Sequence, residues 1–246
     1  MILHIPHAST HIPERFLDQY VISSEELSRM NLRLCDHFTD ELFQHESSSR
    51  IVFGYSRVLV DVERFRDDNL ESAASMGFGK FYSRSYDGRP LRRDLFKHEI
   101  SELLRLYDSH HESFEREVAR DLDESGACLI VDCHSFPEVN PPWLEPATTE
   151  QPDFCIGTDE YHTPHRLASA CGEVIEQLGF SVRYNDPFSG SIVPLKFYQA
   201  DNRVSSVMIE VNRALYMDEA TGEKSQDFDE VQASISSLLS AIDSII

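Results

Sequence analysis

The 246-residue chain has few positive charges and no long apolar segment. Its 22 lysines and arginines stand against 43 aspartates and glutamates, which gives a net charge of −21. Nucleic acid phosphates and anionic lipids repel such a chain, so we expect neither as a partner. No apolar run reaches the length of a membrane span, and no basic leader precedes the first apolar residues. We therefore expect a cytoplasmic protein.

Cysteine and glycine motifs are also missing. Five cysteines are an odd number and no C-x-x-C occurs, which argues against a disulfide framework and against a cysteine zinc knuckle. The 10 glycines do not form a P-loop, a Gly-x-Ser-x-Gly elbow or a dinucleotide-binding fingerprint. The usual sequence evidence for nucleotide binding, or for a serine hydrolase of this type, is therefore absent.

Strand-like apolar runs alternate with helical patterns along the chain, which predicts an α/β layered domain. No linker divides it, so we expect a single domain over residues 1–246. A polar segment over 66–90 is expected to form a long loop, and the proline-rich segment 137–152 to be irregular. The predicted strands are 2–5, 51–53, 58–62, 127–133, 180–184 and 204–211, and the predicted helices are 23–42, 91–122, 163–178 and 228–242.

Three polar residues stand at or near the ends of apolar, strand-like runs: His7, His134 and Glu210. Strand ends of an α/β sheet are where ligand sites form. Two imidazoles with nearby carboxylates suit a catalytic zinc, and a further carboxylate can act as its base. Asp132 shares a strand face with His134 and could orient that ring. This pattern predicts a metal-dependent hydrolase.

Glu210 is unusual because it interrupts the apolar run from Val207 to Val211. A buried carboxylate costs several kcal/mol unless it is paired or protonated. Burial raises a carboxyl pKa, which suits a general base near neutral pH. Arg64 follows another apolar run and could hold a substrate carboxylate, or it could form a surface ion pair with a neighbouring acid. Other histidines, such as His110 and His162, are expected to face solvent.

The ordered set of motifs resembles the N-formylglutamate amidohydrolase family. The resemblance extends from residue 2 to about 218. The matching stretches are Ile5-Pro-His7-Ala-Ser, Cys35-Asp36-His-Phe-Thr-Asp40-Glu-Leu, Ser56-Arg57-Val-Leu-Val-Asp61-Val-Glu-Arg64-Phe, Met76-Gly-Phe-Gly-Lys-Phe-Tyr82, Asp132-Cys-His134-Ser-Phe, Asn185-Asp-Pro-Phe-Ser189-Gly190 and Ile209-Glu-Val-Asn-Arg213-Ala-Leu-Tyr-Met-Asp218. The resemblance implies a zinc hydrolase related to the zinc carboxypeptidases and aspartoacylase. It also implies a single three-layer α/β domain with a mixed central sheet, of the zinc-exopeptidase type.

The resemblance also implies roles for individual residues. The zinc ligands would be His7, Asp36 and His134, with His37 as the alternative to Asp36, and Glu210 would be the general base. Another divalent metal would also suit these ligands. The residues implied in substrate binding are Arg57, Arg64, Ser189, Gly190 and Arg213. One departure stands out: Glu63-Arg64 occupies the place of Asn-Arg in the related aspartoacylase pattern, which leaves the acidic substrate open.

The expected activity is hydrolysis of an N-formyl or N-acyl amide of an acidic amino acid, such as N-formylglutamate. Two alternatives stay open. The chain could hydrolyse another N-acyl amino acid or a peptide-like amide, or it could bind a metal and a carboxylate without catalysis. The expected partner is a small-molecule N-acyl amino acid, and the oligomeric state stays open.

Overall fold

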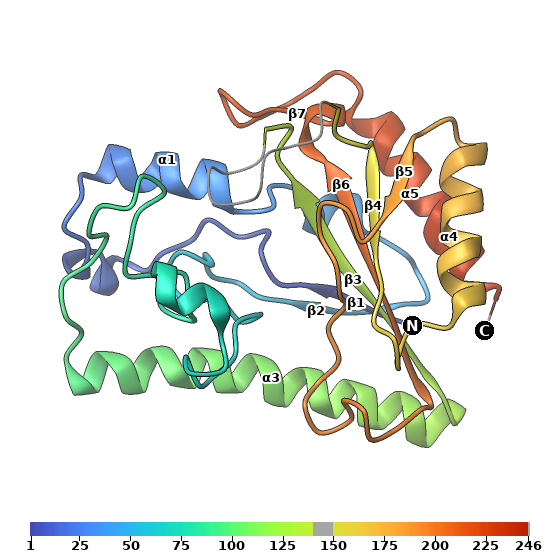
Figure 1. The fold of residues 1–246 in the computed structure, drawn as a ribbon, viewed down its shortest axis with the longest axis horizontal. Helices are drawn as coiled ribbons and strands as arrows, with labels where there is room; N and C mark the ends of the chain where they lie inside the picture. The colour runs from blue at the N-terminus through green and yellow to red at the C-terminus, as the bar shows by residue number, and fades with distance from the viewer. Residues whose placement is uncertain (140–149, 246) are drawn as a thin grey trace. The chain divides into compact units, whose positions relative to one another are not determined.

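The computed structural model describes residues 1–139 and 150–245 (Figure 1). The chain forms two compact units. Unit 1 comprises Met1–Ile5, Phe38–Ile51 and Phe114–Ile246, and unit 2 comprises Pro6–His37 and Val52–Ser113. Most of the segment 137–152, predicted to be irregular, lies outside the described residues. The expectation of a single domain over 1–246 stays a prediction.

Unit 1 is built on a mixed six-stranded sheet in the order β2-β1-β3-β6-β4-β5 (Figure 1). The strands are β1 (Ile2–Ile5), β2 (Ser49–Val52), β3 (Cys128–Phe136), β4 (Phe154–Gly157), β5 (Val182–Tyr184) and β6 (Val204–Asn212). Strands β1, β3 and β6 are parallel, whereas β4 is antiparallel to β6 and parallel to β5. The predicted α/β class with a mixed central sheet is confirmed. Strand β4 was not predicted; its four residues come directly after the proline-rich segment 137–152, which was expected to be irregular.

One face of this sheet carries apolar side chains at one end of its strands and polar side chains at the other. Alternate residues of a strand share a face, and the pairs Ile2↔Ile130 and Cys128↔Val204 lie on the same one. These residues pack on the last turns of α3 (Lys97–Ser125) through Phe114, Val118 and Leu122. Further along the same face, the apolar side chains give way to His4, Asp132, His134 and Glu210. The sheet therefore presents buried polar groups at the carboxyl ends of its central parallel strands.

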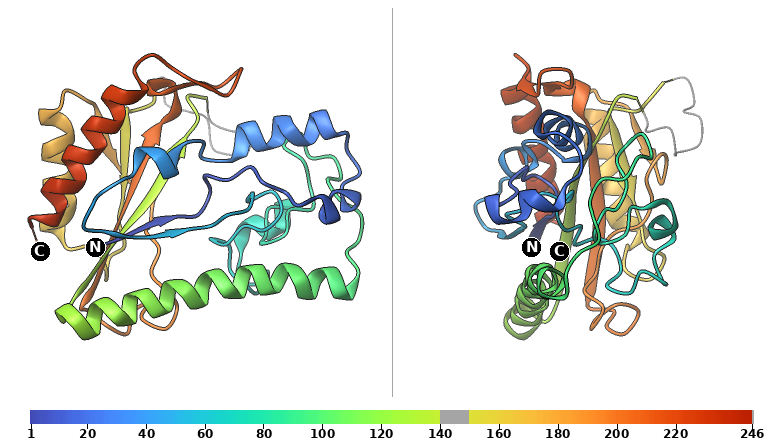
Figure 2. Two further views of the ribbon diagram at one scale, coloured as in Figure 1. Left: turned by 180° about the vertical axis from the view of Figure 1, so that it is seen from behind. Right: turned by 90° about the vertical axis from the view of Figure 1, so that its left-hand side faces the viewer.

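The other helices of unit 1 are α2 (Thr39–Leu42), α4 (His165–Gln177) and α5 (Phe228–Asp243). Figure 2 shows α4 and α5 side by side, and α4 also packs on β4 and β5. Apolar residues of α5 recur every three or four positions and are buried, as the sequence predicts. The turn η3 (Arg213–Leu215) and the hairpin β7 (Met217–Asp218) with β8 (Glu223–Lys224) precede α5.

Unit 2 contains little regular structure. Its elements are η1 (Glu14–Gln19), α1 (Ser24–Leu34), η2 (Ser72–Met76) and the first part of α3. Ser23 caps α1 in a reciprocal pair with Glu26, a motif that the Ser-Ser-Glu-Glu sequence predicts. Its core gathers Phe16, Leu59, Leu103 and Tyr107 with their neighbours. No helix among residues 1–139 and 150–245 combines the length and apolar character needed to cross a bilayer.

Three predicted elements are wrong in part. Residues 58–62 are fully buried but form turns, with the amide groups of Leu59 and Val60 bonded to the Ser56 carbonyl, so burial rather than strand pairing explains their apolar character. The helix predicted over 23–42 ends at Leu34, because Cys35 takes an extended conformation, and the left-handed Phe38, with φ of 64°, then precedes the short helix α2. The long helix begins at Lys97 rather than at Leu91.

Candidate functional site

His7 lies two residues beyond β1 and is buried in unit 2. Its Nε2 is 2.9 Å from Oδ1 of Asp61, which is fully buried. An ionised carboxylate can only accept a hydrogen bond, so Nε2 of His7 carries a hydrogen. Histidine ligands of metals are usually held in this way through the second ring nitrogen. Sequence reasoning gave Asp61 no role, although it interrupts an apolar run just as Glu210 does.

Asp61 is the centre of a dense polar cluster in unit 2. Its Oδ2 accepts hydrogen bonds from Arg57 Nη2 at 2.9 Å and from the Tyr82 hydroxyl at 2.6 Å. Its Oδ1 also accepts the backbone N–H of Glu63 at 3.1 Å. Burial alone would raise the pKa of Asp61, but the charges of Arg57 and His7 hold that pKa well below its usual value. Asp61 is therefore ionised and fixes the position of the His7 ring.

Two further carboxylates lie beside the other nitrogen of His7. Nδ1 is 3.7 Å from Asp36 Oδ2 and 3.6 Å from Glu63 Oε2. Burial and the charge of Arg57 lower the pKa of His7, but Asp61, Glu63 and Asp36 outweigh them, so that pKa is raised above its ordinary value. The site thus favours positive charge at or near this ring.

Asp36 lies in the break between α1 and α2, and not on a helix as an ideal extension of α1 would place it. Its backbone N–H donates to the His7 carbonyl at 2.9 Å, and its side chain is only 2 % exposed. The alternative residue, His37, has its Nε2 3.2 Å from the Asn31 carbonyl of α1. Within unit 2, it is Asp36 that lies beside His7.

The two arginines of this cluster differ in exposure. Arg57 uses Nε and Nη2 on Asp61, whereas Arg64 lies 3.6 Å from Asp61 and 3.7 Å from Glu71. Burial lowers the pKa of both guanidinium groups, but Asp61 raises it above the ordinary value. About a third of the Arg64 side chain reaches solvent, against 18 % for Arg57. Arg64 is therefore the better placed of the two to meet a ligand.

In unit 1, Asp132 on β3 holds two histidines. Its Oδ1 is 2.8 Å from His4 Nδ1 and 3.1 Å from His134 Nε2, and its Oδ2 accepts the Ile192 N–H at 3.2 Å. Burial would raise the pKa of Asp132, but His134 and His4 lower it well below the usual value. His134 therefore donates from Nε2, as His7 does. Strand alternation had already indicated the Asp132–His134 pair.

Glu210 lies on β6 directly opposite His134 on β3 and opposite Cys155 on β4. Its side chain is buried, as the apolar run around it predicted. Burial is the main cause that raises the pKa of the Cys155 thiol to about 11, and the Glu210 carboxylate adds to it. Cys155 is therefore a protonated core thiol near neutral pH. The structure brings His134 and Glu210 together on one sheet face.

Ser189 and Gly190 belong to a segment that crosses this face. The Phe188 carbonyl accepts a hydrogen bond from Cys155 Sγ at 3.2 Å. Gly190 has φ of +94°, a left-handed conformation that favours glycine. Its carbonyl passes so close to Gly157 that a Cβ there would lie 2.3 Å away. The turn predicted to bind substrate therefore runs over β4, on the face that carries Glu210.

Arg213 is almost fully buried at the end of β6. Its Nε donates to Ser135 Oγ at 3.1 Å and its Nη2 donates to the Ser135 carbonyl at 3.2 Å. These bonds tie the end of β6 to the end of β3. The role of Arg213 in substrate binding stays a prediction.

Two histidines that the sequence placed in solvent are buried. His162 accepts the Gln199 N–H at Nε2, and its Nδ1 is 2.7 Å from the Val204 carbonyl. His110 packs edge-on against Phe53 in unit 2. Both predictions were wrong because polar neighbours in the sequence do not show whether the fold buries a given side chain. His162 has the contacts of a structural residue.

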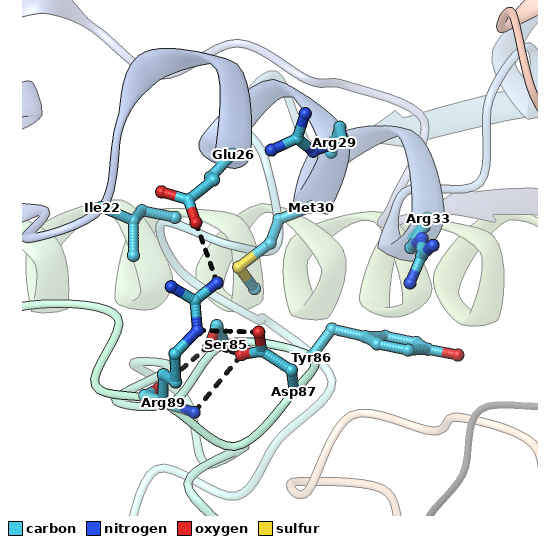
Figure 3. Close-up of a pocket in the computed structure, with 9 residues that line it drawn as sticks. All are labelled: Ile22, Glu26, Arg29, Met30, Arg33, Ser85, Tyr86, Asp87 and Arg89. Atoms are coloured by element: carbon cyan, nitrogen blue, oxygen red, sulfur yellow. Dashed lines mark hydrogen bonds and ion pairs between the residues drawn. The ribbon is translucent and has the colours of Figure 1, made fainter.

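A surface pocket of unit 2 lies between α1 and the segment 85–89 (Figure 3). Arg89 bridges Glu26 at 2.8 Å and Asp87 at 2.7 Å, and Arg33 lies over the Tyr86 ring. The pKa of the Glu26 carboxyl is lowered to about 2, chiefly by its hydrogen bond from Arg89. The pKa of the Asp87 carboxyl is also lowered to about 2, chiefly by its hydrogen bond from Ser85. None of the candidate site residues lines this pocket.

Comparison with known proteins places this geometry in context. The model of the N-formylglutamate amidohydrolase family matches residues 1–217. The crystal structure of an N-formylglutamate amidohydrolase from Ralstonia eutropha JMP134 is similar with a TM-score of 0.84 and 22% identity, over 99% of this chain and 93% of that one. A gene product of Agrobacterium tumefaciens is similar with a TM-score of 0.64 and 18% identity, over 100% of this chain and 90% of that one. No protein with a curated description matches the sequence. At these identities the two structures demonstrate a shared fold.

Proposed function

Because the chain belongs to the N-formylglutamate amidohydrolase family, we propose that it is a zinc-dependent enzyme that cleaves the N-formyl or N-acyl amide of an acidic amino acid. Family membership makes it a hydrolase of carbon–nitrogen amide bonds. N-Formylglutamate is the first substrate to test, and the match over residues 1–217 is the observation that carries the proposal. The proposed metal ligands are His7, Asp36 and His134, and the proposed general base is Glu210.

The chemistry of the donor set supports a metal. His7 and His134 each have Nε2 held by a buried, ionised aspartate, which is how metal-binding histidines are usually oriented. Asp36 adds a buried carboxylate beside His7. Two imidazoles and a carboxylate form the usual protein ligand set of a catalytic zinc. A bound zinc ion would act as a Lewis acid and promote the ionisation of water.

Glu210 is proposed to move the proton of the reaction. Its carboxylate accepts a proton from the attacking water and delivers it to the leaving nitrogen, so that formate and the free amino acid leave. Its side chain is buried on the sheet face that also carries His134, which places the proposed base beside a proposed metal ligand. The segment around Gly190 would bring backbone groups close to the substrate on the same sheet face.

The substrate carboxylate needs a cationic partner, and Arg64 is our first choice. Its guanidinium is partly exposed and is only loosely paired with Asp61 and Glu71. A planar guanidinium binds a carboxylate through two parallel hydrogen bonds. Glu63 adds a negative charge next to Arg64 in sequence, so neutral N-formyl amino acids belong on the test panel as well.

The experiment is to measure metal content and turnover on a panel of N-formyl and N-acetyl amino acids. We expect zinc in the purified protein, highest activity on an acidic N-formyl substrate, and loss of activity with a chelator that zinc restores. Glu210→Gln should keep the metal and lose most turnover, whereas Glu176→Gln on the surface of α4 should change neither. Zinc without turnover on any substrate would instead favour the non-catalytic binding protein.

The compartment is a proposal as well. The five cysteines are all thiols, and all are buried. Reduced cysteines are usual in the cytoplasm, where disulfides are rare. We therefore propose a cytoplasmic enzyme with a small-molecule substrate.

A further inference from the structure

Glu71 is a buried acid of unit 2 that lies beside Arg64, the arginine proposed to bind the substrate carboxylate. Its side chain is only 8 % exposed, and its Oε1 is 3.7 Å from Arg64 Nη1. Its Oε1 accepts the Ala73 N–H at 3.0 Å, and its Oε2 accepts the Phe65 N–H at 3.3 Å. These two bonds tie the Glu71 carboxylate to the residue after Arg64 and to the first turn of η2.

The Arg64 guanidinium has a second negative neighbour in Asp61. Its Nε is buried 3.6 Å from Asp61 Oδ2 and has no hydrogen-bond partner among the residues that the structure describes. The nearer positions on Asp61 Oδ2 belong to Arg57 and to the Tyr82 hydroxyl. The Tyr107 hydroxyl donates to the Arg64 carbonyl at 2.8 Å and so fixes the backbone at this point. Arg64 therefore lies between two fixed carboxylates at ion-pair distance.

The exposures of Arg64 and Glu71 show from which side a ligand can approach. About a third of the Arg64 side chain reaches solvent, whereas Glu71 is buried, so Glu71 lies on the inner side of the guanidinium. At 3.7 Å the opposite charges attract each other without forming a hydrogen bond. Such a contact orders a long side chain and leaves its donors available to a carboxylate. A side chain that is ordered in advance loses less conformational entropy on binding.

We propose that Glu71 is a positioning residue that, together with Asp61, orients Arg64 for the carboxylate of an N-formyl or N-acyl amino acid. This inference rests on the proposed function and deepens it. Glu71 lies within the segment 66–90, which the sequence predicts only as a polar loop. Because Glu71 acts through Arg64 and not on the reacting atoms, its loss should change substrate binding and not the chemical step.

The test is steady-state kinetics on the best substrate of the N-formyl panel. Glu71→Gln removes the charge but keeps an oxygen that can accept a backbone N–H. We expect KM to rise about fivefold with kcat within about twofold, since ordering one long side chain on binding weakens affinity by about 2- to 12-fold. Glu71→Asp keeps the charge and should show a smaller rise. Glu102→Gln, which removes an acid of unit 2 paired with Arg15 at 2.7 Å, should change neither constant.

A double-mutant cycle with Arg64 separates positioning from a general structural role. In an Arg64→Gln background the further change Glu71→Gln should lower kcat/KM by less than about twofold, because the side chain that Glu71 orients is gone. Urea denaturation of each variant identifies any general loss of folding. If Glu71→Gln fails to fold, Glu71→Asp carries the cycle, because its shorter side chain cannot keep the same distance to Arg64.

The outcomes separate this inference from the proposed function. A wild-type protein that hydrolyses no member of the panel overturns both. An active wild type overturns only the role of Glu71 if the KM of Glu71→Gln is unchanged, or if kcat falls while KM stays constant. A lowered KM would show that Glu71 competes with the substrate for Arg64, and equal losses in both backgrounds would show a structural role; either result also overturns positioning.

Discussion

The buried pair of Asp61 and Arg57 should contribute far more to stability than an exposed pair of the same chemistry. Asp61→Asn keeps an acceptor for His7 Nε2 but removes the charge opposite Arg57, whose nearest other carboxylate in unit 2 is Asp36 at 3.9 Å. Breaking a buried ion pair costs about 3–5 kcal/mol. Because 18 % of the Arg57 side chain reaches solvent, we expect about 3 kcal/mol. For a chain of this length that corresponds to a fall in Tm of roughly 6–12 °C.

The matched control is Asp108→Asn, which breaks the two-pronged pair with Arg66 at 2.7 and 3.1 Å. The side chains of Asp108 and Arg66 are 37% and 55% exposed, and exposed ion pairs contribute about 0–1 kcal/mol to the free energy of unfolding. Thermal and urea denaturation should be measured with a chelator present, because a bound metal stabilises the folded state. Asp61→Asn should also weaken zinc binding by about 10- to 100-fold, since His7 loses its orienting charge. If the two variants melt within 2 °C of each other, the reasoning from burial is refuted.

Three further changes test other parts of the structure. Phe114→Ala removes a fully buried ring that stacks on His4 at 4.6 Å, and should cost about 3–5 kcal/mol by urea denaturation; a loss below 1 kcal/mol would contradict the assigned packing. Ser23→Ala removes the cap of α1 and should cost about 1 kcal/mol without changing the metal content. Glu99 has a pKa lowered to about 2, chiefly by its hydrogen bonds to Arg93. A lowered pKa adds stability above the unfolded value of about 4.3, so the stability difference between wild type and Glu99→Gln should shrink as pH falls from 5 toward 2. If the stability difference stays constant between pH 5 and 2, the ion pair of Glu99 with Arg93 is not its source.

Sequence periodicity predicted much of unit 1 and less of unit 2, and the reason is physical. Strands β1, β3 and β6 are almost wholly buried and contain apolar runs, and α5 shows a clear three-to-four residue repeat. In unit 2, residues 58–62 are just as apolar and just as buried, yet they form turns. An apolar run reports burial, and only a neighbouring strand makes it part of a sheet.

The same contrast applies to the candidate site. Asp132 and His134 are two residues apart on one strand, so alternation alone places them on one face. Glu210 could be recognised because it interrupts the apolar residues of β6. Asp36 could not be placed by periodicity, since the helix that its neighbours predict ends before it. Its position depends on a backbone hydrogen bond to His7, 29 residues away in the chain.

His7 and His134 show why local sequence reveals one histidine–aspartate pair and hides the other. Each has its Nε2 on a buried aspartate whose pKa is held down by the groups it binds. For His134 that aspartate lies two residues earlier on the same strand, whereas for His7 it lies 54 residues further along the chain. Asp61 is fixed by Arg57, Tyr82 and backbone groups and does not belong to a regular element. A search for acids that interrupt buried apolar runs finds both Asp61 and Glu210, so burial of charge is a better guide to such a site than secondary structure.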